Sequence, residues 1–133
     1  MNTLFASKVW DHVLQSRKPL VQLFYSRLFT TFPQYQALFD DIDEPRRRKL
    51  VGTFGVAACA ADDTEIVHPH LMRMGKQLAI LHLNKADLHN FQQVFVDVLA
   101  ECCGDQWTPD CEKAWNEIFE HHLIPNLHHG LMQ

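Results

Sequence analysis

The chain has 133 residues, of which 47% are hydrophobic and 11% aromatic, and its formal net charge is -4 when its nine histidines are counted as neutral. A chain of this length buries roughly two-thirds of the surface that its unfolded form exposes, which supports one hydrophobic core without disulfides or a structural metal. We therefore expect a single domain over residues 1–133, and the length excludes a two-domain enzyme. The 12 basic residues are outnumbered by 16 acidic ones and form no basic tail, so neither nucleic acid nor a membrane is an expected partner.

The cysteines and the N-terminal residues indicate a compartment. The four cysteines follow no CxxC spacing, and residues 1–10 are only patchily apolar, unlike a signal peptide. We expect a cytoplasmic protein with reduced thiols that are ordinary buried residues. A zinc site from the last three cysteines and a histidine of the 121–122 pair is less favoured, because Cys102 and Cys103 would point about 100° apart on a helix. No run reaches the roughly 18 to 20 apolar residues that span a bilayer.

Apolar residues recur with helical spacing along the first third of the chain. A first helix begins after a cap at Asn2 or Thr3, and a second has Pro19 in its first turn, where the missing N–H group costs nothing. Pro33 ends the second helix, and a short helical turn follows over residues 35–39. The apolar positions at helical spacing are Leu4, Val9, Trp10, Leu14, Leu20, Phe24 and Leu28.

An acidic loop, residues 40–44, precedes a third long helix that opens at Pro45. Carboxylates are favourable at a helix N-terminus, so we expect the loop to cap this helix. Its expected buried stripe is Leu50, Phe54, Ala57 and Ala61. Gly52, Gly55 and Ala58 keep the helix slim enough for another body to approach closely.

The run His68-Pro69-His70 predicts the start of the next helix, which ends near Asn84. Asp87 can cap the helix after it, and Gly104 ends that helix in the usual position for a left-handed cap. The apolar stripes are Leu71, Met74, Leu78 and Leu81 in the first of these helices and Phe91, Phe95, Val98 or Leu99, and Cys102 in the second.

The run Thr108-Pro109-Asp110 predicts the start of the last long helix, and Pro125 is expected to end it. One face of this helix carries Trp115, Ile118, Phe119 and His122. No segment shows the alternating pattern of a strand. The sequence therefore predicts an all-α domain of about six to eight helices with short connections.

Two stretches resemble those of a known family. The run Gly104-Asp-Gln-Trp107-Thr108-Pro109, followed by Ala114-Trp115, resembles the link between the last two helices of bacterial single-domain haemoglobins, flavohaemoglobin globin domains and neuroglobin-like proteins. Leu71-x-x-Met74-Gly75-Lys76 resembles the start of the helix that presents the proximal histidine of these globins. Between Tyr25 and Trp115 the family pattern follows this chain without insertion or deletion. The resemblance implies a globin fold, a three-over-three sandwich of helices.

The resemblance also implies a pocket for haem b, which globins hold through one histidine while the open side of the iron binds O₂ or NO. In the ungapped register the histidine position is occupied by Leu78, and an aliphatic side chain has no lone pair to donate to iron. Leu88 and Phe119 stand where these globins often have tyrosines. Three polar positions that support an axial imidazole are thus all apolar.

The opposite wall of the implied pocket is closer to the family pattern. Tyr25 takes the place of the tyrosine that hydrogen-bonds bound ligand in bacterial members, Phe39 that of an aromatic packed on haem, and Leu50 that of the apolar residue over the iron. Arg46 replaces the usual histidine or glutamine. Lys49 falls near the expected place of a haem propionate.

Other side chains are alternative iron ligands. His82 lies one turn beyond Leu78, so that an unbroken helix puts both on one face about 6 Å apart. Lys49 is a second candidate, because some globins use a distal lysine. Each of the remaining donors, Met74, His68 and His70, is more simply explained as structural.

The paired histidines at 121–122 and 128–129 are expected in solvent. The basic run 46–49 follows acidic residues on the first turns of a helix. Local pairing and solvation therefore explain it better than a phosphate or nucleic-acid contact.

A haem-sized space must be filled or closed. An empty volume of about 400 Å³, at roughly 24 cal/mol per Å³, costs on the order of 10 kcal/mol, which is comparable to the stability of a whole domain. Either a ligand occupies the space, or the helices move inward and apolar side chains close it. The expected lining is Tyr25, Phe39, Arg46, Lys49, Leu50, Phe54, Met74, Leu78, His82 and Leu88.

The leading hypothesis is a divergent globin that is haem-free, or that holds haem b or another apolar ligand unconventionally. Its role is then sensory, regulatory, or the binding of a protein partner or a second copy. The alternative is a haem-binding globin that carries or senses O₂ or NO through His82 or Lys49. We do not expect an enzyme, because no catalytic arrangement is visible; peroxidase or NO-dioxygenase activity requires the haem first.

Overall fold

The computed structural model describes residues 3–16 and 19–133 and is all-α, with no strand among these residues. The helices are α1 (Thr3–Gln15), α2 (Leu20–Thr31), α3 (Gln34–Phe39), α4 (Glu44–Cys59), α5 (Thr64–Leu78), α6 (Lys85–Cys103), α7 (Pro109–Ile118) and α8 (Ile124–Leu131). Short 3-10 turns, Ala79–Leu81 and Gly104–Gln106, follow α5 and α6, and a π-helical segment, Phe119–Leu123, joins α7 to α8. The predicted all-α class is therefore confirmed.

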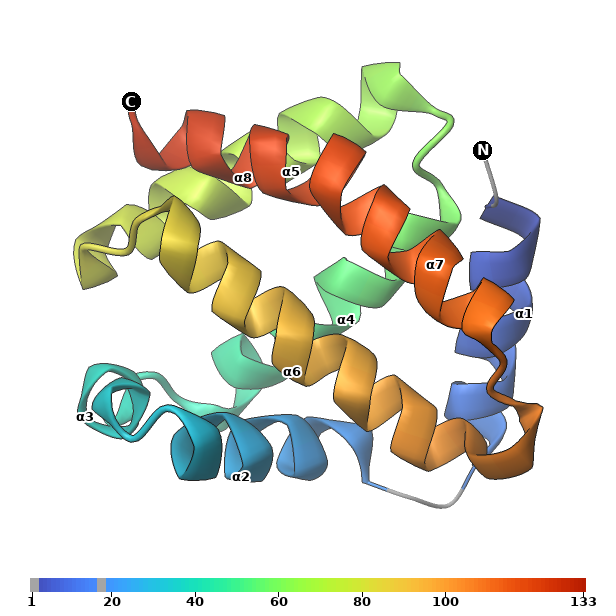
Figure 1. The fold of residues 1–133 in the computed structure, drawn as a ribbon. Helices are drawn as coiled ribbons and strands as arrows, with labels where there is room; N and C mark the ends of the chain where they lie inside the picture. The colour runs from blue at the N-terminus through green and yellow to red at the C-terminus, as the bar shows by residue number, and fades with distance from the viewer. Residues whose placement is uncertain (1–2, 17–18) are drawn as a thin grey trace.

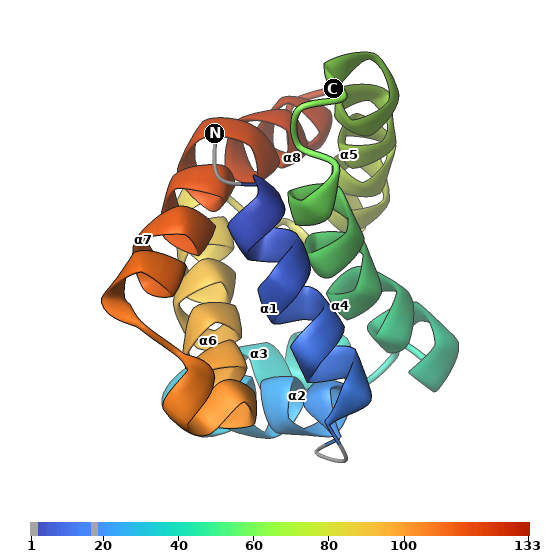
Figure 2. The same ribbon diagram turned by 90° about the vertical axis from the view of Figure 1, so that its right-hand side faces the viewer.

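The helices form two layers, as the three-over-three arrangement requires. Helix α6 and the long α7–α8 helix lie in front of α4 and α5 in Figure 1, while Figure 2 shows α1 beside α4. Helix α5 packs against α8, and α2 packs against α6, so these contacts hold the two layers together. Within the described part of the chain, no helix is long and apolar enough to cross a membrane.

Helix starts follow the predicted capping chemistry, with one change of residue. Asp43 accepts the backbone N–H of the third residue of α4 at 3.0 Å, and Thr108 does the same for α7 at 3.2 Å. For α6 the cap is Asn84 rather than Asp87. The two residues exchange backbone-to-side-chain hydrogen bonds, so Asp87 is the third-position partner of a capping box. Thr3 is already helical, and the alternative cap at residue 2 lies outside the described residues.

Prolines were the less reliable boundary signals. Pro19 and Pro33 stand directly before α2 and α3, and α2 has already ended at Thr31. Helix α5 begins at Thr64, so Pro69 lies inside it and does not start it. Burial of Val67 in the first turns anchors this segment to the core and offsets the hydrogen bond that proline removes.

Pro125 does not end the last helix. Proline sterically crowds the carbonyl group four residues before it in an α-helix. The helix here forms a π turn instead, in which the N–H group of Ile124 donates to the carbonyl oxygen of Phe119, five residues earlier. The side-chain amide of Asn126 donates to the carbonyl oxygen of His122 at 2.7 Å. The helix therefore continues to Leu131.

Glycines allow two close approaches between helices. A Cβ atom on Gly75 of α5 would lie 2.2 Å from the carbonyl oxygen of Leu127, and one on Gly130 of α8 would lie 2.9 Å from Gly75 Cα, so the two backbones touch. The ring of Trp10 packs directly on Gly55 of α4, in agreement with the prediction that small residues let another part of the protein approach this helix closely. Gly104 ends α6 with φ +54° and ψ -124°, a positive φ as expected but outside the left-handed helical region.

Candidate functional site

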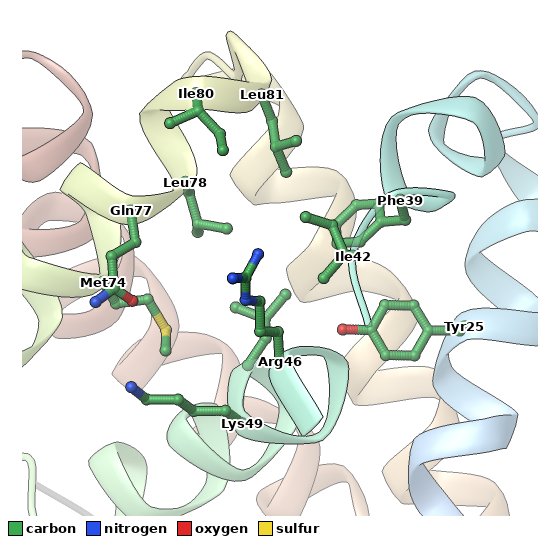
Figure 3. Close-up of a pocket in the computed structure, with 11 residues that line it drawn as sticks. Tyr25, Phe39, Ile42, Arg46, Lys49, Met74, Gln77, Leu78, Ile80 and Leu81 are labelled. Carbon is green, nitrogen blue, oxygen red and sulfur yellow. The ribbon is translucent and has the colours of Figure 1, made fainter. Parts of the chain in front are cut away.

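A pocket of about 450 Å³ lies between α2, the α3–α4 region, α4 and the end of α5. Figure 3 shows side chains converging on it from these elements. The lining residues are Tyr25, Phe39, Ile42, Arg46, Lys49, Leu50, Met74, Gln77, Leu78, Ile80 and Leu81. The helices therefore do not move inward to close the space, and the volume is of the size that cofactor sites have.

The structure brings together seven of the ten residues expected to line this pocket. Those seven are Tyr25, Phe39, Arg46, Lys49, Leu50, Met74 and Leu78. Phe54 and Leu88 are 1% exposed and lie in the core instead. Phe54 has ring centroids of Phe95 at 5.4 Å and Phe119 at 5.6 Å, so it supports the pocket from behind and does not face it.

His82 is the third residue that does not reach the pocket. The expectation assumed an α-helix running unbroken from Leu78 to His82. Instead α5 ends at Leu78, a 3-10 turn follows, and His82 adopts a left-handed conformation with φ +58°. The tighter turn changes the face on which each side chain falls, so Leu81 lines the pocket and His82 is exposed. The structure gives His82 no place as a ligand in this pocket.

Four lining residues were not found from the sequence. Leu81 and Ile80 belong to the unexpected 3-10 turn, and Gln77 lies one residue before Leu78. Ile42 is the one apolar residue of the acidic loop 40–44. An apolar side chain among four acidic ones indicates a residue that faces inward, and this pattern could have identified Ile42 as part of the lining.

The hydroxyl group of Tyr25 is already committed to the backbone. It donates to the carbonyl oxygen of Arg47 at 2.9 Å, although it also faces the pocket in Figure 3. Tyr25 is 5% exposed, and this burial raises the pKa of its phenol above the ordinary value. The phenol therefore stays protonated, and its proton is held by the protein.

Arg47 organises the wall behind Tyr25. Its Nε atom donates to the carbonyl oxygen of Ile42 at 3.1 Å, and its Nη2 atom donates to that of Phe39 at 2.6 Å. Arg47 thus holds the end of α3 and the loop that follows it. The guanidinium lies 5.4 Å from the ring centroid of Tyr25 and 5.6 Å from that of Phe29, within the range of a cation–π contact. This role was not foreseen, because a run of basic residues does not reveal which one turns inward.

The other basic residues pair locally or remain at the rim. Arg48 contacts Glu44 at 3.3 Å and Arg46 lies 3.9 Å from Asp43, with all four side chains largely in solvent, as predicted. Arg46 and Lys49 also line the pocket and are both exposed; Figure 3 shows the guanidinium of Arg46 among the lining side chains and the amine of Lys49 to one side of them. Among the residues that the structure describes, no acidic side chain lines the pocket. A mainly apolar space thus has two cationic groups at its rim.

The lining chemistry decides whether a haem fits. The volume suits a macrocycle, but among the lining residues there is no imidazole or thiol, and Leu78 supplies no lone pair. The potential donors are the thioether of Met74 and the amine of Lys49, which must lose a proton first. The pocket therefore fits a haem in volume and does not fit one held through a histidine.

The remaining histidines lie away from the pocket. His70 lines a second hollow of about 340 Å³ beside α4 and α5. His121 and His129 are exposed as expected, but His122 and His128 are half-buried, so the prediction of exposed pairs was wrong for these two. None of the four cysteines forms a disulfide; Cys102, Cys103 and Cys111 are buried, and Cys59 is half-buried.

These features define a helical protein with a cofactor-sized pocket bordered by α2, α3, α4 and the end of α5. Comparison with models of protein families matches residues 22–124 to the globin family. The chain belongs to the globin family. No curated protein sequence matches it. Globins generally bind haem and small gases, which makes the donor set of this pocket the feature that needs explanation.

Proposed function

We propose that this chain is a globin without histidine-ligated haem, and that its pocket binds an apolar molecule with an anionic group, in a sensory or regulatory role. The observation that carries the proposal is Leu78. It lines the pocket at the end of α5, where the ungapped register of bacterial single-domain globins has the proximal histidine.

Two further residues support the loss of axial ligation. Leu88 and Phe119, which replace family tyrosines in that register, are each 1% exposed and packed in the apolar core. Neither can orient an imidazole by hydrogen bonding, and metal-bound histidines need such partners. A site that lost the ligand and both supports is consistent with a pocket that no longer holds iron.

The rim favours an anionic ligand. The lining is mainly aliphatic and aromatic, while Arg46 and Lys49 supply positive charge and no acidic lining residue opposes it. Within the described residues, the one ion pair of Arg46 is the exposed contact with Asp43 at 3.9 Å, which water screens. A carboxylate at this rim gains charge-assisted hydrogen bonds while its apolar part enters the pocket.

A second candidate function is haem binding through Lys49. Lys49 lines the pocket on α4, beside Leu50, and has a terminal amine that can become a ligand when deprotonated. The protein would then carry or sense O₂ or NO. The first function requires no change of protonation, and for that reason we prefer it.

Titration of the purified protein with haemin tests both candidates. The wild type is expected to give no sharp stoichiometric Soret band, and Leu78→His is expected to create one. Lys76→His is the matched control, because it adds an imidazole on the exposed side of the same helix. A tight wild-type complex would overturn the haem-free proposal, and its loss in Lys49→Ala would establish the second candidate.

Calorimetry tests the ligand class. A long-chain carboxylate is expected to bind more tightly than the alcohol of equal chain length, and the difference should shrink in Arg46→Gln and Lys49→Gln. The matched control is Arg48→Gln, because Arg48 lies in the same basic run, is exposed, and does not line the pocket. Equal affinity of the wild type for acid and alcohol would refute the anionic preference.

A further inference from the structure

Two histidines from distant parts of the chain meet outside the pocket. His68 of α5 and His122 of the π-helical segment have ring centroids 6.0 Å apart and planes inclined by 38°. Both side chains are half-buried. The pair joins α5 to the π-helical segment, and the two elements also contact each other elsewhere.

One nitrogen atom on each ring lacks a hydrogen-bond partner within the described structure. These atoms, His68 Nε2 and His122 Nδ1, are both inaccessible to solvent. Buried polar atoms in proteins are nearly always paired, so each such atom calls for a cause. Two of the four such atoms among the described residues lie on these neighbouring rings, so one shared partner would satisfy both.

The spacing is close to that of two imidazoles on one metal ion. Imidazole nitrogens bind Zn²⁺ at about 2.0–2.1 Å, so two rings on one tetrahedral ion have centroids about 5 Å apart. The centroids of His68 and His122 are 6.0 Å apart, so the two rings share an ion after an approach of about 1 Å.

His122 lies in the π turn that precedes Pro125. The titratable groups near its ring include His68, the exposed His121, and Asp62, whose Oδ2 accepts a hydrogen bond from Thr3 at 2.8 Å.

We propose that His68 and His122 form a two-imidazole site for a borderline transition-metal ion, such as Zn²⁺, Ni²⁺ or Cu²⁺, that is separate from the globin pocket. Imidazole is a preferred ligand of these ions. No cluster of three or more candidate ligands exists among the described residues, so the other ligands are water molecules, which reach the ion once the half-buried rings turn outward. A bound ion ties α5, which carries Leu78 into the pocket wall, to the long C-terminal helix.

Isothermal calorimetry of the full chain with ZnCl₂ or NiCl₂ tests the proposal. We expect one dominant equivalent, and at least a tenfold loss of affinity in His68→Gln or His122→Gln. His121→Gln and His129→Gln are the matched controls, because both remove exposed histidines, one of them adjacent to the site. Equal binding in wild type and in both site variants would mean adventitious ions only and would overturn the proposal.

Nitrogen NMR of the wild type gives a readout that does not depend on folding of a variant. On addition of Zn²⁺, the signals of His68 Nε2 and His122 Nδ1 should shift together to the range of metal-bound imidazole, with the same midpoint. If neither nitrogen shifts while other histidines do, a water molecule or a proton is the shared partner, and the metal site is refuted.

Discussion

The closest backbone contact of the fold gives the sharpest stability prediction. Helices α5 and α8 touch at Gly75 and Gly130, and α5 also carries the pocket wall. Gly75→Ala adds one methyl group at this crossing. The new Cβ would lie 2.2 Å from the carbonyl oxygen of Leu127, more than 1 Å short of the 3.4 Å at which ordinary contacts begin.

The expected cost is large because the opposing atoms belong to a backbone. No flexible side chain can move aside, so the two helices must separate, and overpacking of this kind costs about 3 kcal/mol. Alanine is favoured over glycine inside a helix by about 1 kcal/mol, which leaves a net destabilisation of about 2 kcal/mol. For a chain of this length that corresponds to a fall in Tm of about 7 °C.

Gly52→Ala is the matched control for this prediction. Gly52 also lies inside a long helix, but a Cβ there would meet nothing within 4 Å. The same substitution should therefore raise stability by about 0.5–1 kcal/mol, or Tm by about 2–4 °C. Thermal unfolding followed by circular dichroism measures both variants. An equal rise of Tm in Gly75→Ala would refute the contact between α5 and α8.

Three further predictions concern the tyrosines, one cap and the core. Burial and a hydrogen bond to Asp87 raise the pKa of Tyr35 to about 12, and burial raises that of Tyr25, so the folded protein should show no tyrosinate absorbance at pH 10, where an exposed tyrosine is half ionised. The stability that Tyr35 contributes is full below pH 10 and is lost as the pH rises through 12; early ionisation would contradict this. Thr108→Ala removes the cap of α7 and should cost about 1 kcal/mol in urea unfolding, with no change expected if the hydrogen bond is absent. Phe54→Ala should cost about 3–5 kcal/mol, and a cost below about 1 kcal/mol would contradict its placement in the core.

The helices were predictable because their signals are local. Apolar spacing and capping side chains act within a few residues, and Thr108 and the acidic loop before α4 did what their chemistry predicts. Proline was misleading at positions 69 and 125. Whether a proline ends a helix depends on what the following turn gains by packing, and that gain comes from other parts of the chain.

The pocket was predictable where the family register applied to regular helix. Tyr25, Arg46, Leu50 and Leu78 fell on the lining as expected. The register failed after Leu78, because helical spacing says nothing about where an α-helix tightens into a 3-10 turn. For this reason His82, an alternative ligand because of its spacing from Leu78, is exposed to solvent.

The pairing of His68 with His122 could not be foreseen from spacing at all. The two residues are far apart in the chain, and one of them lies in a π turn that no local pattern predicted. Only the packing of α5 against the C-terminal helix brings the rings together.

Tyr25, which the resemblance to bacterial globins places on the distal side of the pocket, bears on the choice between the two proposed functions. A tyrosine at this position is an argument for haem as long as its hydroxyl has no other use. Here the hydroxyl donates to Arg47, and the guanidinium of the same residue lies over the ring and holds the carbonyl groups of Phe39 and Ile42. Tyr25 is thus required to join α2 to the start of α4 whether or not a gas ligand ever binds. The presence of Tyr25 is therefore compatible with a haem-free globin. The residue that distinguishes the two proposed functions is Leu78.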